Sequence, residues 1–301
     1  MRPLAHPQGC RRGSMAKGGV LSTRLDALLP AEMADRCERI GARKASLDTV
    51  TTLGQAFQAG AFVALGACLM TVVLAASRAL PYGVGRLAGG LALCAGLIPI
   101  VMLGAELFVG DNLVVMAFAS RKIRPARLLR HWGLVYAGNL LGAASVALLA
   151  LGGLHLKEVD GSLIATALTI AADKCALQPL QAVALGLMGS VLVCLATWLC
   201  FGAHSPAEKV LLTLFPISAL AASGFEHVIA NMYFVPLGLL IRATDPATVA
   251  ALARAGLQAD VAGLTLANWV LHSLLPVTLG NLLGGGGLVG LTYWLLYLRR
   301  R

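Results

Sequence analysis

The sequence predicts an all-α membrane protein that crosses the bilayer several times. The 301 residues are 58% hydrophobic and only 13% charged, and their mean hydropathy of +0.79 is higher than that of ordinary soluble domains. The apolar residues fall into long runs, each near or above the roughly 20 residues that a membrane-spanning helix needs. The 34 glycines suit closely packed helices, and the short alternating segments of a membrane β-barrel are not seen.

The N-terminal region is polar. Residues 1–20 are basic and glycine-rich and lack the apolar core of a secretory signal, so we predict a disordered extension, with Met15 as an alternative start. Residues 21–48 are predicted to form an amphipathic helix on the cytoplasmic surface of the membrane. The apolar residues at helical spacing in it are Leu25, Leu28, Leu29, Met33 and Ile40.

Residues 49–301 are predicted to form one membrane domain of six spans. Basic residues collect in the loop at 121–130 and at Arg299 to Arg301, which places that loop and both termini in the cytoplasm. The net charge of +10 therefore reflects membrane topology better than nucleic-acid binding. The predicted spans are 52–76, 87–119, 127–152, 176–202, 207–241 and 263–298.

The second and fifth spans are too long for one straight crossing, and each is interrupted. The first interruption has Gly104 and Glu106 and the other has Gly224 and Glu226, in GLIPIVMLGAELFVGDNLVVM and LFPISALAASGFEHVIANMYF. Each lies in the second helix of a three-helix half, so the halves must enter the membrane in opposite directions. This pattern predicts two inverted repeats with broken helices around a substrate path.

The helix N-termini at the breaks would favour a small anion, and Asp111 or Asn112 could cap the first of them. Glu106 and Glu226 would repel an anion unless backbone N–H groups neutralise them, so we expect them to clamp the broken segments. His227 is the remaining titratable group at the second break. A histidine inside a membrane is a functional candidate, although a lone buried histidine often only packs.

Lys174 lies in AADKCALQPL, at the predicted outer mouth of the fourth span. It would either attract anions to that mouth or only extend its ammonium group to water, as interfacial lysines do. No nucleotide-binding signature, catalytic Ser/His/Asp set or metal cluster stands out, and the seven cysteines include no CxxC pair. We therefore predict no enzyme, no cofactor and no metal.

Three segments resemble the formate/nitrite transporter family, and within it the formate channels: GAELF, GFEHVIANMYFVPLG and PVTLGNLLGGGGLVGLTYWLLYLR. The resemblance runs from LLPAEMA near residue 28 to the C-terminus. It implies a homopentamer of six-helix protomers with an aquaporin-like fold, in which each protomer has its own pore.

The resemblance also implies roles for individual residues. His227 would be the proton-relaying pore histidine, with pore positions also at Glu226, Asn231, Lys174 and Asn281. Apolar constrictions would be formed by Leu97, Leu107, Phe108, Val193 and Leu220, and a mobile gating loop by Val109, Gly110, Asp111 and Asn112. Val109 and Ser190 depart from the family pattern, which has a threonine and an asparagine there.

From these observations we predict a transporter of small monovalent anions, with formate and protons as its partners, in the inner membrane of a bacterial-type cell. Nitrite and hydrosulfide are rival substrates, because both are small conjugate bases. A neutral-solute channel of aquaporin type is a rival of another class, and a membrane protein with a purely structural role is the remaining alternative.

Overall fold

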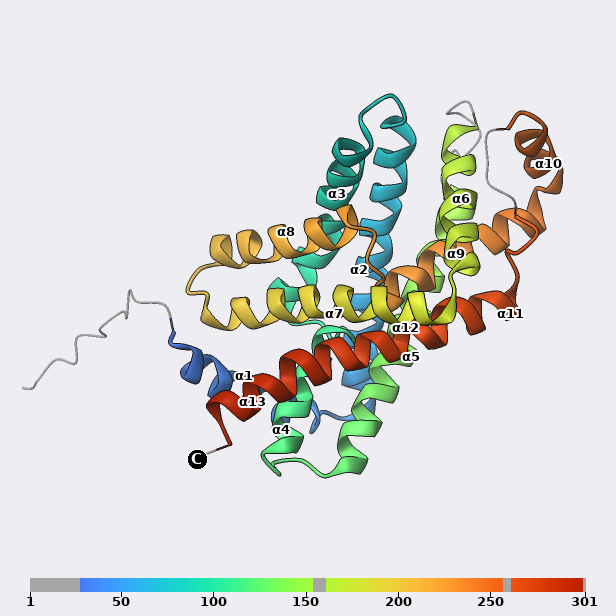
Figure 1. Cartoon of the computed structure of the whole chain (residues 1–301). Coiled ribbons are helices and arrows are strands. Elements are labelled where there is room, and N and C mark those ends of the chain that lie inside the picture. The colour runs from blue at the N-terminus through green and yellow to red at the C-terminus, as the bar shows by residue number, and fades with distance from the viewer. Residues whose placement is uncertain (1–27, 154–160, 257–260, 300–301) are drawn as a thin grey trace, which may run out of the picture.

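The computed structural model describes residues 28–153, 161–256 and 261–299, and every regular element within these ranges is a helix (Figure 1). The predicted extension at 1–20 and the first seven residues of the predicted helix at 21–48 lie outside the described residues. Five described helical segments are long and apolar enough to cross a membrane, and a sixth is added if α9 (Val228–Thr244) and α10 (Pro246–Arg254) are counted as one bent pair.

The first helix, α1 (Pro30–Lys44), begins with a proline in its first turn, where the missing N–H costs no hydrogen bond. Met33, Ala34 and Cys37 form its buried side, in one cluster with Met116 and Trp198. Part of the apolar face of α1 is therefore covered by the protein itself, whereas Leu29 of the predicted face is 67% exposed. In Figure 1, α1 lies beside α4 (Val115–Ala119) and α13 (Thr292–Tyr297), with which it is in contact.

The first half of the membrane domain contains α2 (Thr49–Ala76), α3 (Tyr82–Leu103) and α5 (Pro125–Gly153). The predicted second span at 87–119 is interrupted: α3 ends at Leu103, and the chain resumes as η1 (Gly110–Val114) and α4 (Val115–Ala119). Helix α2 packs against both α3 and α5.

The second half contains α7 (Pro179–Gly202), α8 (Pro206–Ala222) and α9 (Val228–Thr244), and α8 and α9 together cover the predicted fifth span. Two further helices were not predicted: α6 (Ser162–Ala176), which precedes α7, and α10 (Pro246–Arg254), which is bent by 99° from α9. The last membrane helix runs from Leu266 to Tyr297 as α11 (Leu266–Asn268), η2 (Trp269–Leu274), α12 (Leu275–Asn281), η3 (Leu282–Leu291) and α13 (Thr292–Tyr297).

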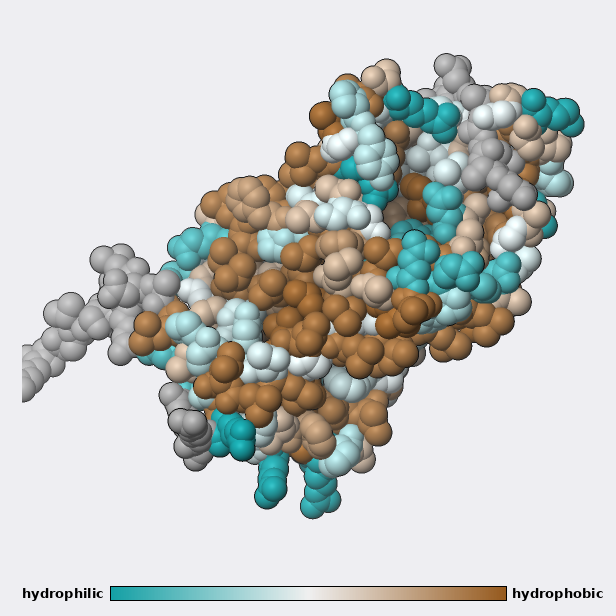
Figure 2. All heavy atoms as spheres, in the orientation of Figure 1, coloured by the Kyte–Doolittle hydropathy of each residue, from teal (hydrophilic) through white to brown (hydrophobic). Residues whose placement is uncertain are grey.

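Many large apolar side chains face outwards. Figure 2 shows them as a broad brown area across the middle of the visible face, with hydrophilic groups gathered towards its ends. Among those exposed are Leu148, Leu180, Phe215, Leu279 and Leu296. Such a surface is stable in contact with lipid or with a neighbouring subunit, and it would be unfavourable in water.

Glycines bring the helices into close contact. A Cβ atom at Gly142 of α5 would lie 2.0 Å from the Phe57 carbonyl oxygen of α2, so only glycine fits there. We expect Gly142→Ala to lower the free energy of unfolding by about 1–3 kcal/mol, because overpacking forces the two helices apart. Thermal unfolding in detergent measures this. Gly133→Ala is the control, because Gly133 is on the same helix and a Cβ atom there would have no neighbouring atom within 4 Å. An equal loss of stability in both variants would contradict the packing account.

Candidate functional site

The two breaks are built alike. Gly104 and Gly224 follow α3 and the last turn of α8 with φ of 70° and 74°, a left-handed conformation that favours glycine. In the first break the Ala105 N–H donates to the Ile100 carbonyl at 3.1 Å, and in the second the Phe225 N–H donates to the Leu220 carbonyl at 3.1 Å. The two sequences therefore end their helices by the same local rule.

An asparagine holds each broken segment. The Asn139 side chain accepts from the Phe108 N–H at 2.9 Å and donates to the Glu106 carbonyl at 2.9 Å. Asn281 repeats this arrangement at the second break, where it accepts from the Val228 N–H at 3.1 Å and donates to the Glu226 carbonyl at 3.2 Å. Both amides are fully buried. They satisfy backbone groups that have no helical partner and no access to water.

The glutamates have a different role from the predicted one. We expected Glu106 and Glu226 to accept from backbone N–H groups, but each carboxylate pairs with a lysine. The Lys44 ammonium lies 2.8 Å from Glu106 Oε2 and 2.6 Å from Asp111 Oδ1. Lys174 pairs with Glu226. The backbone clamping falls to the asparagines, because an amide offers both a donor and an acceptor whereas a carboxylate only accepts.

At the first break, Lys44 joins α1 to a buried acidic cluster. Glu106, Asp111 and His131 lie close enough to share a cation, and His131 Nε2 is 3.5 Å from Asp111 Oδ2. Lys44 is the cation in contact with both carboxylates. The side chain of Asp111 therefore does not cap η1, and Asn112 does not either: its Nδ2 donates to the Asn281 carbonyl at 2.9 Å. A buried carboxylate is strongly destabilising without a cation beside it, so Asp111 pairs with Lys44.

At the second break, Glu226 joins α6 to α9. One carboxylate oxygen accepts from Lys174 and the other accepts from Asn231 Nδ2 at 2.7 Å. The same Asn231 group donates to Ser273 Oγ at 3.0 Å. The charge of Lys174 is thus neutralised within the protein. An anion at this mouth would meet a lysine whose charge is already balanced.

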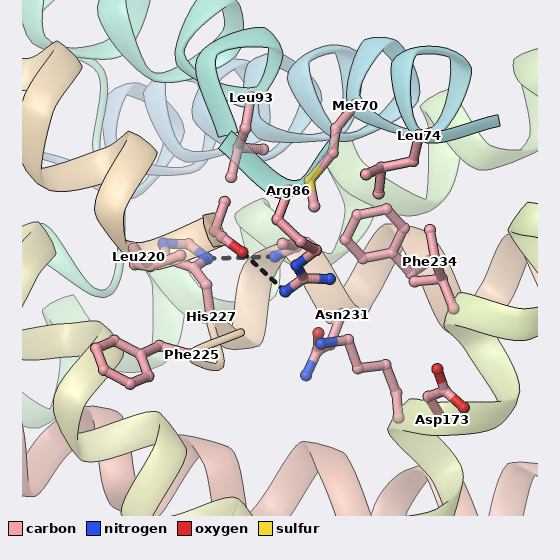
Figure 3. Close-up of a pocket in the computed structure, with 14 residues that line it drawn as sticks. Met70, Leu74, Arg86, Leu93, Asp173, Leu220, Phe225, His227, Asn231 and Phe234 are labelled. Atoms are coloured by element: carbon pink, nitrogen blue, oxygen red, sulfur yellow. Dashed lines mark hydrogen bonds between the residues drawn. The ribbon is translucent and has the colours of Figure 1, made fainter. Parts of the chain in front are cut away.

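His227 is the N-cap of α9. Its Nδ1 accepts from the Ala230 N–H at 3.2 Å, which leaves the proton of the neutral ring on Nε2. The side chain is only 4% exposed, and Nε2 has no hydrogen-bond partner among the described residues. His227 lines a pocket of about 90 Å³ with Arg86, Lys174, Leu220 and Asn231 (Figure 3). The pocket therefore offers an unused hydrogen-bonding group to a small molecule.

The other predicted site residues are distributed around this pocket. The five constriction residues are buried in one apolar cluster, and they are Leu97, Leu107, Phe108, Val193 and Leu220. Of these five, only Leu220 lines the pocket. Asn281 contacts the break without lining the pocket. Three members of the predicted gating loop, Gly110 to Asn112, lie in η1, and all four of its residues are buried.

The family model for formate/nitrite transporters matches residues 31–295, nearly the whole described chain. The chain belongs to the formate/nitrite transporter family. The formate channel FocA of Escherichia coli K12 is 37% identical over 275 residues, which are 91% of this chain and 96% of that protein. The FocA of Haemophilus influenzae is 31% identical over 265 residues, 88% of this chain and 93% of its own.

Solved structures of this transporter family share the fold. A pentameric formate channel with formate bound superposes with a TM-score of 0.75 at 37% identity, covering 83% of this chain and 98% of that one. An FNT family ion channel superposes with a TM-score of 0.73 at 27% identity, covering 88% and 98%. Membership of this family, together with the apolar helices, makes the chain a multi-pass membrane protein.

Sequence reasoning missed four residues of this transporter's site: Lys44, Arg86, His131 and Asn139. A signal existed for Asn139, because the string GNLLG occurs at 138–142 and again at 280–284, around the two clamping asparagines. Lys44 lies in a polar helix before the first span, where a lysine is unremarkable. Lys44 reaches Glu106 and Asp111 because α1 packs against η1 in the folded protein.

Proposed function

We propose that the chain is a passive channel for small monovalent anions, with formate as its main substrate, in which the permeant exchanges a proton at His227. The observation that carries the proposal is the buried Nε2 of His227, which lines a small pocket and has no partner among the described residues. The relatives named as formate channels support formate as the anion.

Energetics favour a proton step. Moving a bare charge through the centre of a bilayer costs from about 2.5 to more than about 10 kcal/mol. Keeping a proton on an acid whose pKa is near 4 costs only about 4 kcal/mol at pH 7. The apolar residues around His227, such as Leu220 and Phe225, exclude water that would stabilise the ion. A small weak acid therefore passes such a constriction most easily in its neutral form.

The contacts of His227 suggest how the exchange proceeds. In the neutral ring, Nε2–H donates to the arriving anion while Nδ1 accepts from the Ala230 N–H. A second proton can reside on Nδ1 only if the ring releases Ala230. The protonated ring is then able to give its Nε2 proton to formate, which leaves a neutral ring with its proton on Nδ1. The cap bond from the Ala230 N–H forms again only after that proton has left Nδ1 and Nε2 has taken up a proton.

We also propose the assembly and its setting. The matching bonds at the two breaks support two inverted three-helix repeats and an aquaporin-like protomer. The exposed leucines would contact lipid and neighbouring subunits of a homopentamer, and the pentameric assembly of the structural relative supports this. The basic loop at 121–130 supports cytoplasmic termini in a bacterial inner membrane.

Anion flux into proteoliposomes tests the substrate class. We expect the wild-type protein to admit formate and to exclude glycerol. Nitrite and hydrosulfide should compete with formate for uptake. Liposomes without protein are the control. Uptake of glycerol without uptake of formate would contradict the proposal and favour a neutral-solute channel instead. The order of competition among the three anions separates formate from its rivals.

A further inference from the structure

We propose that Arg86 forms an outer binding site for small carboxylate anions, which recruits them to the pocket that contains His227. This inference rests on the proposed function, since formate is such an anion. It assigns to Arg86 the anion attraction that the sequence suggested for Lys174.

The charges around the pocket favour Arg86 over Lys174. Lys174 is paired with Glu226, which is 3% exposed, so the charges of these two side chains cancel. Arg86 forms no ion pair with a carboxylate of the described residues. Asp173, the acidic residue among those that line the pocket, interacts electrostatically with Arg86 and Lys174, but it is exposed to solvent, which weakens these interactions (Figure 3). Arg86 is thus the cation of the pocket that no carboxylate of the described residues contacts directly.

The contacts of Arg86 fix its guanidinium group. Arg86 lies in the first two turns of α3, and its Nη2 donates to the Ala221 carbonyl at the end of α8 at 2.8 Å. A Cβ atom at Gly224 would lie 3.2 Å from Nη2, so the glycine of the second break leaves room for the guanidinium. The Tyr82 ring centroid is 6.0 Å from Arg86 Cζ. The side chain is therefore held beside the break before any ligand arrives.

The remaining donors of Arg86 suit a carboxylate. Arg86 Nε is buried and has no hydrogen-bond partner among the described residues, and the side chain lines the pocket (Figure 3). A guanidinium group binds the two oxygens of a carboxylate through parallel N–H bonds. His227 Nε2, the other unpartnered nitrogen of the same pocket, would receive the anion next. A volume of about 90 Å³ has room for several water-sized groups, enough for formate.

The test compares Arg86→Gln and Arg86→Lys with Arg78→Gln. Arg78 donates to Thr166 Oγ1 at 3.0 Å and does not line the pocket, so it controls for loss of a nearby positive charge. Formate uptake into proteoliposomes is measured against outside concentration at low and high salt. We expect Arg86→Gln to raise KM about tenfold with little change in maximum rate, as for loss of a charged hydrogen bond. The increase should be smaller in high salt, and lysine should restore part of the affinity.

A second measurement separates this inference from the proposed function. Saturation transfer from the purified protein to the formate proton reports binding without transport. If the wild-type protein carries no formate, the proposed function fails. The inference then stands only if the wild-type signal is present and Arg86→Gln loses it. A KM for Arg86→Gln equal to that of Arg78→Gln, or no binding signal in the wild type, would overturn the inference. If Arg86→Gln does not fold, Arg86→Lys decides by whether KM rises.

Discussion

Lys44→Met is expected to lower the free energy of unfolding by about 3–5 kcal/mol, as for loss of one partner of a buried ion pair. Lys44 contacts Glu106 and Asp111 at 2.8 and 2.6 Å, and these carboxylates are only 2% and 4% exposed. Methionine fills similar space but leaves both carboxylates without their cation. Unfolding of the purified protein in detergent measures the loss. The variant should also release α1, which chymotrypsin cleavage near its N-terminus would detect.

The pH dependence of this loss follows from the pKa of Lys44. Burial alone would lower the pKa of Lys44. The negative charges of Asp111 and Glu106 raise it by more than burial lowers it, so the pKa lies above its usual value. A cation with a raised pKa contributes fully below its unfolded value of about 10.4, and the contribution disappears only as the pH rises through the folded value. The stability gap between wild type and variant should therefore stay constant from neutral to mildly alkaline pH. At acidic pH this stability difference should become smaller, because a carboxylate left without Lys44 in the variant becomes protonated.

Arg39→Met is the matched control for Lys44→Met. Arg39 is an exposed cation on the same helix, and its loss should change the free energy of unfolding by less than about 1 kcal/mol. The conservative change Lys44→Arg should retain most of the stability. Equal effects of Lys44→Met and Arg39→Met would show that the buried cluster does not hold α1 in place.

Asn281→Leu is expected to be at least as damaging, with a loss on the order of 3 kcal/mol or more in the free energy of unfolding. The buried amide bonds to the Val228 N–H, the Glu226 carbonyl and the Gly186 carbonyl, and leucine leaves all three unsatisfied. Each unpaired buried group costs about 1–3 kcal/mol. Since Val228 follows His227, the variant should also lose formate flux in any fraction that folds.

Asn268→Leu controls for this substitution. Its side chain donates to the Gly263 carbonyl at 2.9 Å, but this contact is exposed to water, which can replace it. We expect a loss of less than about 1 kcal/mol. Asn139→Leu should match Asn281→Leu, because Asn139 makes the corresponding bonds at the first break. Normal stability of either buried variant would show that the asparagines do not maintain the breaks.

The sequence predicted the helical membrane class and the position of both breaks. Long apolar runs are a strong signal, and the glycines at 104 and 224 mark the helix ends directly. Helix boundaries were less accurate: the second span begins at Tyr82, five residues before the predicted start. No element was predicted at α6, which lies between the predicted third and fourth spans.

Pairings between distant side chains could not be predicted from the sequence. The carboxylates of Glu106 and Glu226 were expected to bind backbone N–H groups because a free carboxylate at either break would repel an anion. Lys44 and Lys174 reach them only after α1 and α6 have packed against the breaks. Local patterns report helix ends, whereas such ion pairs depend on the complete packing of the chain.

The central claim is that formate passes with a proton exchanged at His227. The most direct test records formate uptake and internal pH together in proteoliposomes, for the wild type and for His227→Ala, over a range of external pH. We expect wild-type uptake to depend on external pH and to carry protons inward with formate, and His227→Ala to lose that pH response. Formate uptake without proton movement, or an unchanged pH response in His227→Ala, would contradict the claim.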